Sequence, residues 1–132
     1  MRLLLDTHIL VWWCNDDSAL PASTRRTIAS DESEVFVSAA SIWEIAIKRA
    51  RGRMGFPLER IAEIFEDASF IPLPIAINHA RLAGGLPPHH KDPFDRLLIA
   101  QAQSESLTLV TTDAAIAAYE VSLFPPRTGQ ER

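Results

Sequence analysis

The fold is decided by the segment RLLLDTHIL at residues 2–10, in which a leucine run ends abruptly at Asp6. A short apolar run that stops at a polar residue is typical of a buried strand. The apolar residues over 9–13 then take the spacing of a helix, and Thr7 is placed to cap its start. The segment therefore predicts a strand over residues 2–5 that passes directly into a helix.

The same alternation of strand and helix continues along the chain. Further strands are expected at residues 35–38, 70–73, 107–111 and 121–124, and helices at 21–28, 39–51, 58–65, 75–83, 93–102 and 114–119. Pro72 restricts the strand at 70–73 to an edge of the sheet, because proline cannot donate a ladder hydrogen bond. Gly52 and the pair Gly84–Gly85 are expected to end two of the helices. Strands that alternate with helices predict an α/β domain with a mainly parallel sheet.

Composition and charge limit the classes of protein to which the chain can belong. A chain of 132 residues with 47% hydrophobic residues can form one domain, which we place at residues 1–124 with a loosely held polar tail at 125–132. The N-terminal apolar run is too short and too polar for a signal peptide or membrane span, so no membrane association is expected. The only cysteine, Cys14, cannot form an intrachain disulfide, and the expected location is therefore cytoplasmic. A net charge of −4 is unusual for a protein that binds nucleic acid by electrostatics alone.

Four acids lie where the predicted fold would gather them. Asp6 directly follows the strand at 2–5, and Asp113 comes two residues after the end of the strand at 107–111. Glu44 lies in the first turns of the helix after the strand at 35–38. Asp95 is the third residue of a helix that Asp92 is placed to cap. Ligand sites of parallel sheets lie beyond the carboxyl ends of the strands. We therefore expect the four acids to converge at one edge of the sheet.

Converging carboxylates indicate a cation. Like charges held close together repel one another, and burial strengthens the repulsion. Oxygen ligands without a His/Cys spacing favour Mg²⁺ or Mn²⁺ over zinc. Such an ion lowers the pKa of a bound water and orients it for attack on a phosphodiester. The acids therefore favour a metal-dependent nuclease.

Each acid also has a structural interpretation. Asp95 and Asp113 could be helix caps, and Glu44 could form an i,i+4 surface pair with Lys48. Asp6 is the hardest to explain in this way, because an acid at the end of an apolar strand is costly unless it has a function.

Four segments carry a resemblance to a known family. They are LLDTHIL at residues 4–10, SIWEIAIK at 41–48, HKDPFDRLLIAQA at 90–102 and LVTTD at 109–113. In this order they resemble VapC-type toxins of the PIN-domain family, and together they extend over most of the chain. Many relatives have Gly-Lys after the second segment, where this chain has Gly52-Arg53. No family acid is missing.

The resemblance implies a three-layer α/β/α sandwich and Mg²⁺- or Mn²⁺-dependent endoribonuclease activity. It also implies a cognate antitoxin that inhibits the enzyme, and a homodimer. The site residues implied are Asp6, Glu44, Asp95 and Asp113, with Asp6 and Asp95 as the direct metal ligands.

Several other residues leave two interpretations open. The cations Lys48, Arg49, Arg51 and Arg53 could bind RNA phosphates or could offset the dipole at the end of their helix. Lys48 is the best substrate candidate, since it shares a helix face with Glu44. Arg96 could orient a carboxylate or phosphate, or form a surface ion pair. The adjacent His89 and His90 resemble a pair of metal ligands, but in a proline-rich loop they are expected to be exposed to solvent.

Two rival functions fit the same general fold. A phosphoryl-accepting receiver domain also has an acidic, Mg²⁺-binding edge, but here Asp16-Asp17 come too late and no lysine follows Lys91. A catalytically silent PIN-fold module that only binds protein is the second rival, and the complete set of acids argues against it.

Overall fold

In the computed structural model, which describes residues 1–127, five parallel strands form one central sheet in the order β3-β2-β1-β4-β5. The strands are β1 (Arg2–Leu5), β2 (Glu34–Ser38), β3 (Ile71–Leu73), β4 (Thr108–Val110) and β5 (Leu123–Phe124). The helices are α1 (Thr7–Cys14), α2 (Ala22–Ala29), α3 (Ala39–Ala50), α4 (Ile61–Ala68), α5 (Ile77–Gly85) and α6 (Pro93–Glu105), with 3₁₀ turns η1 (Leu58–Arg60) and η2 (Ile116–Ala118).

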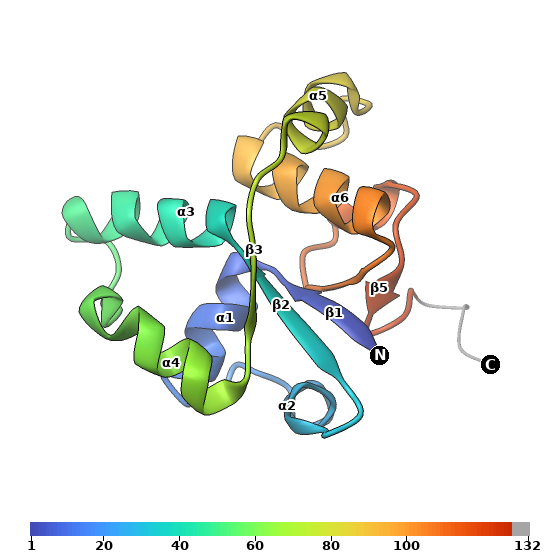
Figure 1. Cartoon of the computed structure of the whole chain (residues 1–132). Coiled ribbons are helices and arrows are strands. Elements are labelled where there is room, and N and C mark those ends of the chain that lie inside the picture. The colour runs from blue at the N-terminus through green and yellow to red at the C-terminus, as the bar shows by residue number, and fades with distance from the viewer. Residues whose placement is uncertain (128–132) are drawn as a thin grey trace.

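The sheet separates two hydrophobic cores. Leu3 and Leu5 of β1 point into one core, which α1, α2 and α4 cover, and Leu4 points into the other, which α6 and η2 cover. This alternation follows from the pleat, which directs successive side chains to opposite faces. The two layers of helices and the sheet between them are visible in Figure 1. The predicted α/β/α sandwich with a parallel sheet is therefore confirmed.

The central position of β1 sets the place of the site. β1 pairs with β2 on one side and with β4 on the other. The strands β2 and β3 therefore extend the sheet on one side of β1, and β4 and β5 extend it on the other side. This change of side at β1 is a switch point, which opens a crevice at the carboxyl ends of the strands. Asp6 stands at that end of β1, and the strand β4 ends beside it at Val110. The predicted edge position of β3, which contains Pro72, is also confirmed.

Some local predictions were wrong. The residue that caps α1 is Asp6, whose carboxylate accepts the Ile9 amide, and Thr7 instead turns inward to bond Ser41. The helix expected at 114–119 is only the 3₁₀ turn η2. The end of α5 at Gly84 and Gly85 was predicted correctly, although neither glycine takes a positive φ.

The first residues of the expected tail contact the domain. The Arg127 guanidinium donates to the backbone carbonyls of Ala117, Tyr119 and Val121, so residues 125–127 are held against the domain. Residues 128–132 of this tail lie outside the described residues. Within residues 1–127, no helix is long and apolar enough to span a membrane.

Two isoleucines on neighbouring helices offer a matched test of this core. Ile99 of α6 is fully buried and Ile77 of α5 is 91% exposed. We expect Ile99→Ala to lower the free energy of unfolding by about 2–5 kcal/mol, because it leaves a cavity under the sheet. Ile77→Ala should change it by less than about 0.5 kcal/mol. Urea denaturation measures both values, and similar losses for the two variants would contradict this arrangement of the core.

Candidate active site

Asp6 is fixed at the junction of β1, β4 and α1. Its amide donates to the Val110 carbonyl at 3.0 Å, and its Oδ1 accepts from the Ile9 amide at 2.9 Å. The residue is only 5% exposed. One carboxylate oxygen therefore caps α1, while the side chain as a whole is held at the carboxyl edge of the sheet.

Glu44 approaches the same edge from α3. Ser38 at the end of β2 caps this helix, and a buried hydrogen bond of 3.1 Å between the Thr7 and Ser41 hydroxyls joins α3 to α1. Glu44 is 5% exposed, and its Oε2 accepts from Lys48 Nζ at 2.8 Å. Its Oε1 is buried and has no hydrogen-bond partner among the described residues. Because Glu44 is buried, its pairing with Lys48 is not the surface pair considered above.

Asp95 and Asp113 meet through a histidine. Asp92 caps α6 by accepting the Phe94 and Asp95 amides, as predicted, and so leaves the Asp95 carboxylate free. Asp95 Oδ2 lies 2.8 Å from His90 Nε2, and Asp113 Oδ2 lies 3.2 Å from the same nitrogen. Asp113 Oδ1 accepts the Ala115 amide. Asp113 is therefore a local cap with one oxygen and a member of the site with the other.

The electrostatics show that these acids influence one another. The pKa of Asp95 is raised to about 6, chiefly by burial and next by the charge of Asp92. The charges of Asp6 and Glu44 act in the same direction, and His90 opposes them. Burial also raises the pKa of Asp6, and the charge of Asp113 acts in the same direction. The structure thus brings together the four predicted acids, Asp6, Glu44, Asp95 and Asp113, hereafter the acid cluster.

The donors of the acid cluster fit a hard divalent cation. Buried polar atoms in proteins are nearly always paired, so the unpartnered Glu44 Oε1 indicates a missing positive ligand. Three possible ligand atoms lie within 4.8 Å of one another, one each from His90, Asp95 and Asp113. Carboxylate oxygens in excess over nitrogen suit Mg²⁺ or Mn²⁺ better than zinc.

Comparison with known proteins agrees with this geometry. The family model of the PIN domain matches residues 3–121. The chain belongs to the PIN-domain family. Ribonuclease VapC22 of Mycobacterium tuberculosis is 29% identical over 117 residues, which cover 84% of this chain and 86% of that protein. The resemblance to VapC-type PIN ribonucleases of toxin–antitoxin systems is thereby confirmed, and the receiver-domain alternative is excluded.

Solved structures show the same fold at low sequence identity. VapBC2 from Rickettsia felis, bound to a promoter DNA fragment, has a TM-score of 0.69 at 17% identity and covers 93% of this chain and 97% of its own. VapC20 of Mycobacterium tuberculosis, a sarcin–ricin loop cleaving toxin, has a TM-score of 0.66 at 12% identity, with coverage of 90% and 95%. A toxin–antitoxin complex from Klebsiella pneumoniae has a TM-score of 0.64 at 17% identity, with coverage of 92% and 94%.

In this PIN domain, His90 is a site residue that sequence reasoning missed. It was expected to be exposed, as His89 is, but its ring lies between Asp95 and Asp113. Adjacent histidines in a proline-rich loop carry no periodicity that would separate them. The available signal was position, since His90 comes two residues before Asp92, which caps the helix carrying Asp95.

Arg96 has a different role from the one expected. Its guanidinium donates to the backbone carbonyls of Ala83, Leu86, Pro87 and His90. The Tyr119 hydroxyl supports the same loop, donating to Pro87 and accepting from the His90 amide. Arg96 therefore positions the loop that presents His90. A contact between Arg96 and the substrate stays a prediction, and these hydrogen bonds do not support it.

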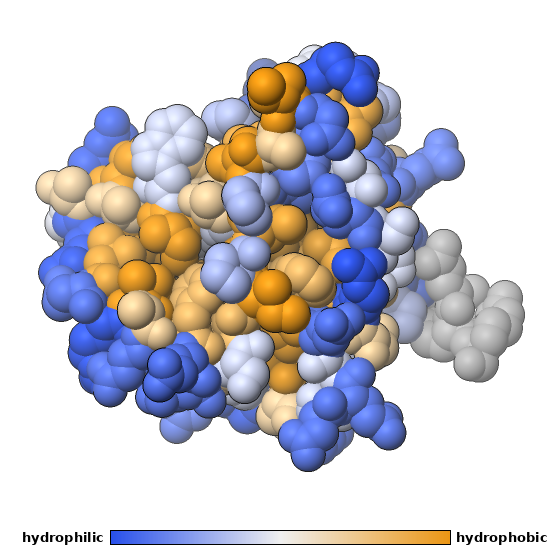
Figure 2. All heavy atoms as spheres, viewed as in Figure 1, coloured by the Kyte–Doolittle hydropathy of each residue, from blue (hydrophilic) through white to orange (hydrophobic). Residues whose placement is uncertain are grey.

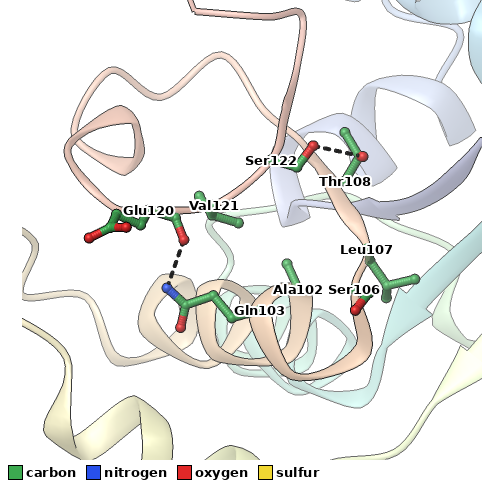
Figure 3. Close-up of a pocket in the computed structure, with 8 residues that line it drawn as sticks. All are labelled: Ala102, Gln103, Ser106, Leu107, Thr108, Glu120, Val121 and Ser122. Atoms are coloured by element: carbon green, nitrogen blue, oxygen red, sulfur yellow. Dashed lines mark hydrogen bonds between the residues drawn. The ribbon is translucent and has the colours of Figure 1, made fainter.

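The PIN domain also has a pocket remote from the acid cluster. Figure 3 shows this pocket, of about 380 Å³, between the last turn of α6 and the segment 120–122. The Gln103 amide donates to the Glu120 carbonyl, and the Thr108 and Ser122 hydroxyls bond to each other. It lies at the opposite end of α6 from Asp95 and has no charge cluster, so the chemistry belongs to the acid cluster.

Stability of the metal-free PIN domain should fall as pH rises. Because the folded pKa of Asp95 is about 6 and the unfolded value is about 3.9, the folded state binds more protons between these values. The contribution is present below the lower value and is lost as pH passes the upper one. From pH of about 4.5 to 7, Asp95→Asn should lose about 2 kcal/mol less than wild type, measured by urea denaturation in chelator.

A matched control separates this effect from general charge. Glu66→Gln removes one exposed carboxylate of α4, far from the cluster in sequence, and should follow the wild-type pH profile. If Asp95→Asn follows that profile as well, Asp95 does not belong to a crowded cluster.

Proposed function

We propose that this chain is an endoribonuclease toxin of the VapC type that hydrolyses RNA phosphodiester bonds with Mg²⁺ or Mn²⁺ at the acid cluster. The observation that carries the proposal is the buried, unpartnered Glu44 Oε1 among converging carboxylates. A buried carboxylate oxygen without a partner is costly even though Lys48 pairs with the other oxygen, and a bound divalent cation would remove that cost. The name of the relative Ribonuclease VapC22 supports RNA as the polymer.

The residues of the acid cluster would have different roles. Asp6 and Asp95 would hold the ion directly, with Glu44 and Asp113 completing the negative charge around it. When bound, the ion would lower the pKa of a water and stabilise the negative charge that develops on the phosphate. Lys48 restrains Glu44 through its 2.8 Å contact, and a proton on His90 Nε2 can bond either Asp95 or Asp113.

Cations beside the cluster can attract the polyanion to an acidic protein. Lys48 lies one turn from Glu44, whereas Arg49 is paired with Glu59 at 2.8 Å. Arg51 and Arg53 are exposed and form no ion pair within residues 1–127. Binding of RNA phosphates by Lys48 stays a prediction, supported by its partial exposure at the site.

A protein partner follows from the solved relatives. Several are toxin–antitoxin complexes, among them the VapBC2 and Klebsiella pneumoniae assemblies. We propose that this chain likewise binds a cognate antitoxin that inhibits it, and that the toxin is a homodimer. The partner would have to cover or disturb the acid cluster to inhibit cleavage.

Loss of a cluster acid should abolish cleavage without unfolding the domain. Asp6→Asn and Asp95→Asn keep side-chain size while removing a negative ligand, so RNA cleavage should fall at least about 100-fold, the loss typical of disturbed metal ligation. The rate of cleavage is measured by gel analysis of labelled RNA incubated with Mn²⁺ or with chelator. Wild-type protein should also stop cleaving in chelator.

Asp31→Asn is the matched control, since it removes an exposed aspartate outside the cluster. It should cleave as wild type does. Undiminished cleavage by folded Asp6→Asn in chelator would contradict the mechanism. A wild-type protein that never cleaves RNA but binds its partner would favour the silent binding module instead.

A further inference from the structure

A pair of aromatic rings stands beside the acid cluster. Trp43 immediately precedes Glu44 in α3, and Phe94 immediately precedes Asp95 in α6. The two rings contact each other nearly at right angles, with centroids 5.2 Å apart. The same two helices that bring the two acids together therefore bring these two aromatic side chains together at their rim.

Trp43 is unusual among the tryptophans of the chain in its exposure. It is 58% exposed, whereas Trp12 and Trp13 are half-buried and pack against a hydrophobic core. A perpendicular contact covers at most one face of the indole, so ring surface stays open to solvent. Large apolar surface left open beside a reactive site is a common sign of ligand binding.

We propose that Trp43, braced by Phe94, stacks against an unpaired nucleobase of the RNA held at the acid cluster. This inference rests on the proposed function and assigns one residue to its substrate site, which would contact an RNA base that is unstacked in a single strand or loop. Duplex bases present no open face, whereas a splayed base stacks readily on an aromatic side chain. Trp43 is thus a positioning residue that places the neighbouring phosphate over Glu44 and Asp95.

The charges along α3 fit the same arrangement. Lys48 lies four residues after Glu44, and Arg51 and Arg53, which form no ion pair with any residue from 1 to 127, follow at the end of the helix. Single-stranded nucleic acids are bound by this combination, in which aromatic rings stack on bases and cations follow the phosphates. Trp43 supplies the base contact at the end nearest the acids.

An apolar groove next to Trp43 offers the alternative. The groove has a volume of about 770 Å³ and lies between α3 and α4, where Figure 2 shows hydrophobic residues gathered; its lining includes Ile42, Trp43, Ala46, Ile61 and Phe65. A protein segment seated there would cover Trp43 too. The contact with Phe94 favours RNA, because it turns Trp43 towards α6 and Asp95, and Phe94 does not line the groove.

The test compares the full-length wild type with Trp43→Ala, Trp43→Phe and the control Ile77→Ala, which removes another exposed apolar side chain. Steady-state cleavage of a labelled single-stranded oligoribonucleotide gives KM and kcat. Trp43→Ala should raise KM about 10-fold with a smaller change in kcat, and Trp43→Phe should restore most of the loss. Ile77→Ala should behave as wild type.

A binding measurement without cleavage completes the design. In chelator, fluorescence anisotropy with the same strand, alone or annealed to its complement, reports the preference for unpaired bases. Wild type should prefer the single strand, and an abasic nucleotide at one position should weaken binding. Trp43→Ala should lose both the preference and the abasic sensitivity, while its melting temperature stays close to that of wild type.

Three results would overturn the inference. If Trp43→Ala binds and cleaves RNA like wild type, Trp43 does not belong to the substrate site. Trp43→Ala that leaves RNA binding intact but weakens self-association or antitoxin binding assigns the residue to the groove. A wild type that neither binds nor cleaves RNA overturns the proposed function itself, which distinguishes that failure from the failure of stacking alone.

Discussion

Mutual repulsion among carboxylates is the constraint on which the rest of this structure depends. Asp6 and Glu44 are each 5% exposed, and the pKa of Asp95 is raised to about 6 by burial and by neighbouring acids. The fold tolerates this arrangement because several rigid elements hold the acids in place: the central strand β1, the hydroxyl contact between Thr7 and Ser41, and the capped start of α6. A divalent cation bound among these acids would offset the repulsion and stabilise the folded state.

The acids satisfy structural and functional demands with different oxygens. Asp6 caps α1 with Oδ1, Asp113 caps a turn with Oδ1 and meets His90 with Oδ2, and Glu44 bonds Lys48 with Oε2 while Oε1 stays unpartnered. A carboxylate has about four lone-pair sites, so one side chain can do both. Cap and ligand are therefore compatible interpretations of Asp113, which the sequence alone presents as alternatives. Asp6 combines the same two roles, although the sequence indicated Thr7 as the cap of α1.

The sequence predicts those features that depend on local spacing. The leucine run before Asp6 and the Asp92-Pro93 start of α6 each combine a strong local signal with the correct place in the fold. Parallel strands then require their carboxyl ends to meet at one edge, which brings the acids together without knowledge of any contact. For this reason the sheet, the helices α1 to α6 and the convergence of the four acids could be predicted, whereas the weaker signal at 114–119 gave only the 3₁₀ turn η2.

The features that were missed depend on contacts between distant segments. Whether His90 or His89 faces the acids is decided by the loop path, which Arg96 and Tyr119 fix through backbone hydrogen bonds. Neither periodicity nor composition encodes such bonds. The contact of Trp43 with Phe94 is of the same kind, since it joins residues from two helices that are far apart in the chain.

Direct binding of Mn²⁺ tests the central claim, that the acid cluster holds a divalent cation. Electron paramagnetic resonance of a Mn²⁺ titration counts free ion against protein, independently of any nuclease activity. The wild type should bind Mn²⁺ saturably at neutral pH, Asp6→Asn should lose that binding, and Asp31→Asn should retain it. If Asp6→Asn binds Mn²⁺ as wild type does, or the wild type binds none at millimolar concentrations, the account of the cluster is contradicted.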